Sequence, residues 1–164
     1  MSKVVILSGG PGSGKTTLAH MLGRTRSLCS ADDAFVQMDG AYVFDPLRLA
    51  EAHASCFRHF MAACAGEKAE FIVVHNTSMS NWERAPYVAC AQAYNLPYLV
   101  VTLNVHPVAS GPRNVHSVPA ERLYAMWERR EAVLPFWPHL QLEPCGFSEI
   151  DEKWVKPVLE YFVK

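Results

Sequence analysis

Gly-Gly-Pro-Gly-Ser-Gly-Lys-Thr occupies residues 9–16, after the apolar run Val-Val-Ile-Leu at residues 4–7 and before a helix-forming segment that starts at Thr17. A buried strand, a glycine-rich turn and a helix in this order are the setting of a phosphate-binding loop, or P-loop. The glycines let backbone amides point at an anion, and the helix N-terminus adds partial positive charge. Lys15 is placed to bridge β- and γ-phosphates, and the Thr16 hydroxyl to hold Mg²⁺. The stretch therefore predicts a nucleoside triphosphate site, lined by Gly9, Gly10, Pro11, Gly12, Ser13, Gly14, Lys15, Thr16 and Thr17.

The composition predicts a single folded domain, residues 1–164, with a core that needs no disulfide. Hydrophobic residues make up 50% of the chain and charged residues 19%, which is typical of a soluble globular protein. No apolar run approaches the ~20 residues of a membrane span, and the first strand begins too early for a secretory signal. The five cysteines lack Cys-x-x-Cys spacing, which favours thiols in a reducing compartment. We therefore expect a cytoplasmic protein with no membrane partner.

The formal net charge of −1 limits how this chain could bind nucleic acid. Proteins that hold long duplexes by neutralising phosphates are usually basic overall. Any contact with nucleic acid must then come from a local patch, or the substrate must be small.

Helical and extended patterns alternate along the chain, which predicts an α/β fold with a parallel sheet flanked by helices. We expect strands at residues 3–8, 27–31, 71–74, 97–102 and 139–142. We expect helices at residues 15–24, 46–65, 81–94 and 119–133, and a C-terminal helix capped by Asp151 and bent or broken at Pro157. Residues 104–118 are expected to form a loop that acts as a mobile lid.

Polar side chains follow the predicted strands, at the edge where open parallel sheets bind ligands. Asp32 and Asp33 follow the second strand, where a carboxylate could take a proton from a hydroxyl nucleophile or hold a water on Mg²⁺. Asn76 and Thr77 follow the third strand and are suited to orienting an acceptor or coordinating through water. Arg113 lies in the lid, and an arginine beside a γ-phosphate stabilises a charge-spreading transition state.

Several aromatic residues have two interpretations that the sequence alone leaves open. They either stack a base at the mouth of the acceptor site or belong to the core. These residues are Tyr42, Phe44, Trp82 and Tyr87.

On these residues the chain resembles the polynucleotide-kinase-like branch of P-loop kinases. Four landmarks match in order over nearly the whole length, namely residues 9–17, Ser-Ala-Asp-Asp at 30–33, the strand that ends at 76–77, and Asn-Val-His-Ser-Val-Pro at 114–119. The resemblance implies a P-loop kinase fold, ATP with Mg²⁺, and phosphoryl transfer to an alcohol group. It also implies that Asp32 is the general base and that Arg113 contacts the transferring phosphate.

The acceptor is predicted from where the chain departs from this family. Phage polynucleotide 5′-hydroxyl kinases carry a phosphate-gripping arginine three residues after the catalytic aspartate, where this chain has Phe35, and a second lid arginine near the position of Ala109. The same family includes small phage kinases that phosphorylate the hydroxymethyl group of 5-hydroxymethyluracil within DNA, a DNA modification step. We expect that acceptor, in DNA that is single-stranded or has an extruded base, slightly ahead of a 5′-hydroxyl. The acceptor-binding residues are then Asp33, Phe35, Asn76, Thr77 and Trp82.

Two further classes of function stay open. The nearly neutral charge would suit a kinase of a small metabolite or nucleoside, and a P-loop alone would suit an NTPase that has no acceptor. A positioned carboxylate at Asp32 opposes the second class, because a base beside the phosphates implies an acceptor hydroxyl. If the chain is encoded by a phage, the host cytoplasm is the expected compartment.

Overall fold

A five-stranded parallel sheet forms the centre of the computed structural model, which describes residues 1–66 and 68–164. The strand order is β2-β3-β1-β4-β5, and every neighbouring pair is parallel. The strands are β1 (Lys3–Ser8), β2 (Arg26–Cys29), β3 (Phe71–Val74), β4 (Tyr98–Leu103) and β5 (His139–Leu142). The predicted parallel α/β architecture is confirmed, and β1 lies at the centre because it pairs with both β3 and β4.

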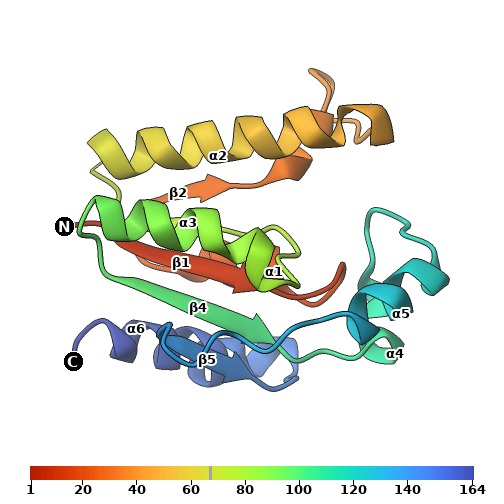
Figure 1. The fold of residues 1–164 in the computed structure, drawn as a ribbon. Coiled ribbons are helices and arrows are strands. Elements are labelled where there is room, and N and C mark those ends of the chain that lie inside the picture. Colours follow the sequence, from red (N-terminus) through yellow and green to blue (C-terminus); the bar gives the residue numbers. More distant parts are fainter. Residues whose placement is uncertain (67) are drawn as a thin grey trace.

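Helices cover both faces of the sheet (Figure 1), which explains why the central strands are continuous apolar runs. Val4 and Ile6 of β1 face α2 (Leu49–Gly66) and α3 (Asn81–Ala93) in one buried cluster. Val5 and Leu7 face the opposite way, into the cluster that contains α1 (Lys15–Met21) and α6 (Lys156–Tyr161). The core therefore lies in two layers, one on each side of a rigid sheet.

Two helices begin or end differently from the prediction, each for a local reason. The helix α1 stops at Met21, before Gly23, whose φ of 63° takes the chain into a left-handed turn. The helix expected from residue 46 starts as a 3₁₀ turn, η2 (Pro46–Arg48), in which the Asp45 carboxylate accepts from the Leu47 amide at 2.9 Å. The regular α-helix α2 follows directly.

The helix after the lid, α5 (Ala120–Glu128), is shorter than predicted because its C-terminal continuation pairs with another segment. The backbone N–H of Glu131 donates to Met79 O at 2.8 Å. The Glu131 carboxylate in turn accepts from the backbone N–H of Asn81 at 2.8 Å. These two bonds draw the chain away from a helical path and attach it beside the start of α3.

The C-terminal helix accommodates its proline without a break. A π-helical turn over Asp151–Val155 runs directly into α6, and Pro157 lies in the first turn of α6, where the helix changes from π to α geometry. The expectation that Asp151 caps this helix is wrong, because the N-cap position is Ile150 and Asp151 is the first residue of the π-helical turn. Glu149 fills a capping role one turn earlier, by accepting from the Gly146 amide at 3.0 Å.

The lid is more structured than the loop predicted at residues 104–118. It contains the short helix α4 (Pro107–Ser110) and a 3₁₀ turn, η3 (Gly111–Arg113). The ring of His106 caps α4 by accepting from the Val108 amide at 3.2 Å. Figure 1 shows α4 and α5 on the side of the molecule toward which the arrows of β1 and β4 point. The lid therefore lies at the carboxyl edge of the sheet.

Across residues 1–66 and 68–164, none of the helices combines the length and the apolar character needed to traverse a bilayer.

Candidate active site

The P-loop connects β1 to α1 and is tightly enclosed by the lid and the C-terminal helix. Gly12 and Gly14 have φ values of 76° and 103°, a region that glycine adopts without strain. A Cβ on Gly12 would collide with the carbonyl oxygen of Ser110 in the lid, and one on Gly14 would lie 2.8 Å from the Trp154 ring. Both glycines are therefore required by backbone conformation and by close packing.

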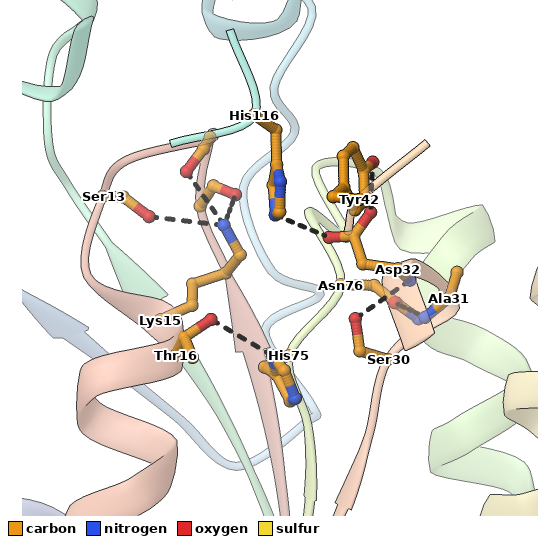
Figure 2. A network of polar contacts seen from close by, with 12 residues as sticks. Ser13, Lys15, Thr16, Ser30, Ala31, Asp32, Tyr42, His75, Asn76 and His116 are labelled. Atoms are coloured by element: carbon orange, nitrogen blue, oxygen red, sulfur yellow. Dashed lines mark hydrogen bonds and ion pairs between the residues drawn. The ribbon is translucent and has the colours of Figure 1, made fainter. Parts of the chain in front are cut away.

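The Lys15 ammonium lies inside the curve of the P-loop (Figure 2), where it donates to Gly9 O at 2.7 Å and Gly10 O at 2.8 Å. Burial lowers the pKa of Lys15 to about 8, and the nearby Asp32 charge opposes that shift. A pKa of about 8 leaves the amine mostly protonated at neutral pH. The loop thus encloses a desolvated cation whose closest partners are neutral carbonyls, a setting that fits an anionic phosphate.

Thr16 and His75 face each other where α1 begins and β3 ends, with Thr16 Oγ1 3.4 Å from His75 Nδ1 (Figure 2). Burial, followed by the charges of Lys15 and His20, lowers the pKa of His75 to about 4, so the ring is neutral at neutral pH. Within the described part of the chain, no group of three His, Cys, Asp or Glu side chains could hold a metal. The exposed Thr16 hydroxyl fits Mg²⁺, which commonly binds through few protein ligands together with phosphates and water.

Asp32 lies in the 3₁₀ turn η1 (Ala31–Phe35), which begins directly after β2 and is fixed by two side chains. The Ser30 hydroxyl accepts from the Asp32 amide at 3.2 Å, and Asn76 Oδ1 accepts from the Ala31 amide at 2.8 Å. Figure 2 shows Asp32 and Lys15 on facing sides of one site. This arrangement can hold a carboxylate rigidly beside bound phosphates.

Each oxygen of the Asp32 carboxylate has one partner from a distant segment (Figure 2). The Tyr42 hydroxyl donates to Oδ1 at 3.1 Å, and His116 Nε2 of the lid is 3.7 Å from Oδ2. Burial, and then the charge of Asp32 and this hydrogen bond, raise the pKa of Tyr42 to about 12, so its phenol stays a donor. The sequence left Tyr42 open between base stacking and core packing, and it gave His116 no role, although His116 lies within the lid stretch at 114–119.

Asn76 and Phe35 were expected to contact an acceptor, but the structure gives both a supporting place. Asn76 is 8% exposed, and its amide nitrogen donates to Tyr87 Oη at 3.3 Å and Cys56 Sγ at 3.5 Å. Phe35 is 2% exposed and packs against Tyr42, with ring centroids 6.1 Å apart. Asn76 therefore holds η1 and Phe35 lies behind the Tyr42 ring, and direct contact of either side chain with an acceptor stays a prediction.

The other predicted acceptor residues have mixed surroundings. The Thr77 carbonyl accepts from the Gly9 amide at 2.9 Å and so ties the end of β3 to the P-loop. Asp33 is exposed on η1, and Trp82 is 84% exposed at the start of α3. Of the aromatic residues left open by the sequence, Tyr87 is core and Phe44 packs 5.1 Å from Phe35.

Arg113 lies in η3, in the lid segment that packs against Gly12. Its Nε is buried and has no hydrogen-bond partner within the described residues. An unpartnered N–H beside the P-loop fits a phosphate oxygen as its acceptor.

Arg84 supports the site in a way that the sequence did not indicate. It is 1% exposed, and burial lowers its pKa. Its N–H groups donate over 2.8–3.2 Å to oxygen atoms of Ser8, Ser78, Met79, Asn81 and Glu131. These bonds join the end of β1, the start of α3 and the segment after α5. Arginines in helices are usually exposed, so no sequence signal could have identified the buried role of Arg84.

We predict that Asn76→Ala lowers the free energy of unfolding by about 1–3 kcal/mol, because it leaves the buried Ala31 amide without an acceptor. Urea denaturation measures this. The matched control is Asn104→Ala, which removes a hydrogen bond to the exposed Glu143 carboxylate and should change stability by less than about 0.5 kcal/mol. Equal effects of the two substitutions would contradict the role given to Asn76.

The sheet order, the P-loop and the helices on both faces define a P-loop kinase fold. The chain belongs to the AAA domain family AAA_33, which matches residues 4–128. The human protein NEDD4-binding protein 2 is 35% identical over an alignment of 132 residues that covers 76% of this chain and 7% of that protein. The chain thus spans a small fraction of that relative's length.

Solved structures share the fold at low sequence identity. The Mycobacterium tuberculosis APS kinase CysC in complex with AMPPNP and APS has a TM-score of 0.67 at 16% identity, covering 99% of this chain and 98% of that one. A gluconokinase from Sinorhizobium meliloti has a TM-score of 0.66 at 15% identity, covering 99% and 97%. Chaetomium thermophilum Kti12 in complex with ADP-AlF3 has a TM-score of 0.64 at 14% identity, covering 98% and 97%. A P-loop kinase-like domain is therefore confirmed, while membership of the polynucleotide-kinase-like branch stays a prediction.

Proposed function

We propose that this protein is an ATP-dependent kinase that transfers the γ-phosphoryl group to a hydroxyl on DNA. The observation that carries the proposal is the position of Asp32 near the Lys15 ammonium, on a turn whose backbone amides donate to Ser30 and Asn76. A carboxylate so placed can take the proton of an attacking hydroxyl, while Lys15 and Arg113 stabilise charge on the phosphates. The Thr16 hydroxyl would be a ligand for Mg²⁺, which when bound neutralises phosphate charge.

The lining of the site supports a nucleobase acceptor. The groups that contact the Asp32 carboxylate are a phenol and an imidazole, from Tyr42 and His116. Phe35, at the position of the phosphate-gripping arginine of phage end-kinases, is buried behind Tyr42. An aromatic surface suits stacking of a base better than gripping of a terminal phosphate. We therefore propose the hydroxymethyl group of 5-hydroxymethyluracil as the preferred acceptor. Exposed Asp33 and Trp82 and half-buried Thr77 are further proposed acceptor contacts.

A small-molecule kinase is the second candidate. The structures that share this fold include an APS kinase and a gluconokinase, and the net charge of −1 gives no general attraction for a polyanion. A DNA acceptor would then bind through a short local contact. A base that carries the reactive hydroxyl would have to leave a duplex stack, at a cost of a few kcal/mol, unless the DNA is single-stranded.

The test is transfer of label from γ-labelled ATP to three acceptors. These are single-stranded DNA with an internal 5-hydroxymethyluracil and both ends blocked, unmodified DNA with a free 5′-hydroxyl, and free nucleosides. We expect labelling of the first acceptor at the highest rate. Labelling only of 5′-hydroxyl ends would replace the proposal by an end-kinase, and labelling only of free nucleosides would replace it by a small-molecule kinase.

A further inference from the structure

Tyr42 and the lid residue His116 form a stacked pair beside Asp32, the proposed general base. Their ring centroids are 4.0 Å apart with an interplanar angle of 29°. Both residues also contact the Asp32 carboxylate, through Tyr42 Oη and His116 Nε2. The three side chains come from η1, from the loop that follows it, and from the lid (Figure 2). A planar ring is therefore already in place beside Asp32.

Tyr42 is the fixed member of the pair. Its hydroxyl is bonded to Asp32, its ring lies edge-on against buried Phe35, and its backbone bridges to Val36. His116 is exposed, and its ring stacks on Tyr42 and lies beside the Asp32 carboxylate. The next residue, Ser117, has a left-handed φ of 53°. Tyr42 can thus serve as a preset platform from which the His116 ring can leave.

We propose that the acceptor base stacks on Tyr42 in the place now taken by the His116 ring, so that His116 is a built-in competitor of the acceptor. This inference rests on the kinase function proposed above and narrows its acceptor to a planar ring that bears a hydroxyl group. A centroid separation of 4.0 Å leaves no space for another ring between the two side chains, so base and imidazole exclude each other.

The chemistry at Asp32 follows from the same exchange. The Tyr42 hydroxyl donates a hydrogen bond to Asp32 Oδ1, and departure of the His116 ring leaves Asp32 Oδ2 free to accept a proton. The acceptor O–H proton then passes to Oδ2, the acceptor oxygen forms a bond to the γ-phosphorus, and the bond from that phosphorus to the β–γ bridging oxygen breaks. Phosphorylated acceptor and ADP are the products. Tyr42 is a binding and positioning residue in this scheme, while Asp32 is the base.

Steady-state kinetics with hydroxymethyluracil DNA give the first test. Removing the competing ring in His116→Ala should lower the acceptor KM by about 2- to 10-fold, with the ATP KM unchanged. His116→Phe keeps a ring on Tyr42 and should not lower the acceptor KM. The matched control is His53→Ala, an exposed histidine on the outer side of α2, which should change neither value. An unchanged or raised acceptor KM in His116→Ala would overturn the inference.

Substitutions of Tyr42 test the platform itself. Tyr42→Ala should raise the acceptor KM by roughly 5- to 100-fold, the loss expected for one base stacked on an aromatic side chain. Tyr42→Phe keeps the ring but loses the hydrogen bond to Asp32, so it should retain the acceptor KM and lower kcat. If Tyr42→Phe raised the KM as much as Tyr42→Ala, the ring would not be the binding surface.

An NMR titration tests the exchange without requiring any turnover. In the free protein, the His116 ring protons lie within the ring current of Tyr42, and comparison with His116→Gln assigns them. Adding 5-hydroxymethyluridine DNA with a non-hydrolysable ATP analogue should move these signals toward solvent-exposed values. Unmoved signals with an acceptor that the wild type phosphorylates would overturn the inference alone. Displacement without transfer to any acceptor would instead overturn the proposed kinase function.

Discussion

Lys15→Ala should abolish phosphoryl transfer while leaving the chain folded. The Lys15 ammonium lies at the centre of the P-loop and is the cation placed to bridge β- and γ-phosphates. The carbonyls of Gly9 and Gly10, its present partners, can turn to water after its loss, so the loop itself should survive. Transfer assays and circular dichroism measure the two outcomes.

A matched control for this prediction is Lys68→Ala, which removes an exposed lysine outside the loop. It should keep full activity. Full activity in Lys15→Ala would contradict the assignment of residues 9–16 as the nucleotide site.

Asp32→Asn should reduce transfer by roughly 10²- to 10⁴-fold, the contribution typical of a general base. Asparagine keeps the size of the side chain and can still accept the Tyr42 hydrogen bond, but it cannot take a proton at neutral pH. The KM for ATP should change little, because the contacts that Asp32 makes are with Tyr42 and His116.

The neighbouring carboxylate provides the control for the base. Asp33 is exposed on η1, and Asp33→Asn should cost much less activity than Asp32→Asn. If the larger loss came from Asp33, the two roles would be exchanged. If neither substitution reduced transfer, no carboxylate of η1 would act as the base.

The parts of this fold that could be predicted from sequence are those determined by short-range patterns. Residues 71–74 are apolar at every position, as a strand buried on both faces must be, and β3 has those bounds. The P-loop is similarly local, since its glycines, Lys15 and Thr16 act through one turn and one helix start. The proximity of Asp32 and Lys15 could also be predicted, because each follows a parallel strand and the carboxyl ends of parallel strands lie at the same edge of the sheet.

The parts that could not be predicted depend on contacts between distant segments. Asn76 looked like an acceptor contact because it follows a strand, but its side chain bonds to Ala31, Cys56 and Tyr87. Arg84 gave no sign that it would be buried, since its acceptors are mostly backbone carbonyls of other segments. The stack of His116 on Tyr42 depends on how the lid folds over the site.

We expect this chain to couple cleavage of ATP to phosphorylation of a hydroxyl, with Asp32 as the base. The most direct measurement is the yield of ADP and of phosphorylated acceptor in one reaction, with hydroxymethyluracil DNA whose ends are blocked, followed by mass spectrometry. We predict that each ADP is matched by one phosphoryl ester on the modified base, and that Asp32→Asn lowers both products together. ADP released with free phosphate and an unmodified acceptor would show that the chain hydrolyses ATP without phosphorylating this acceptor, and would contradict the proposed kinase function.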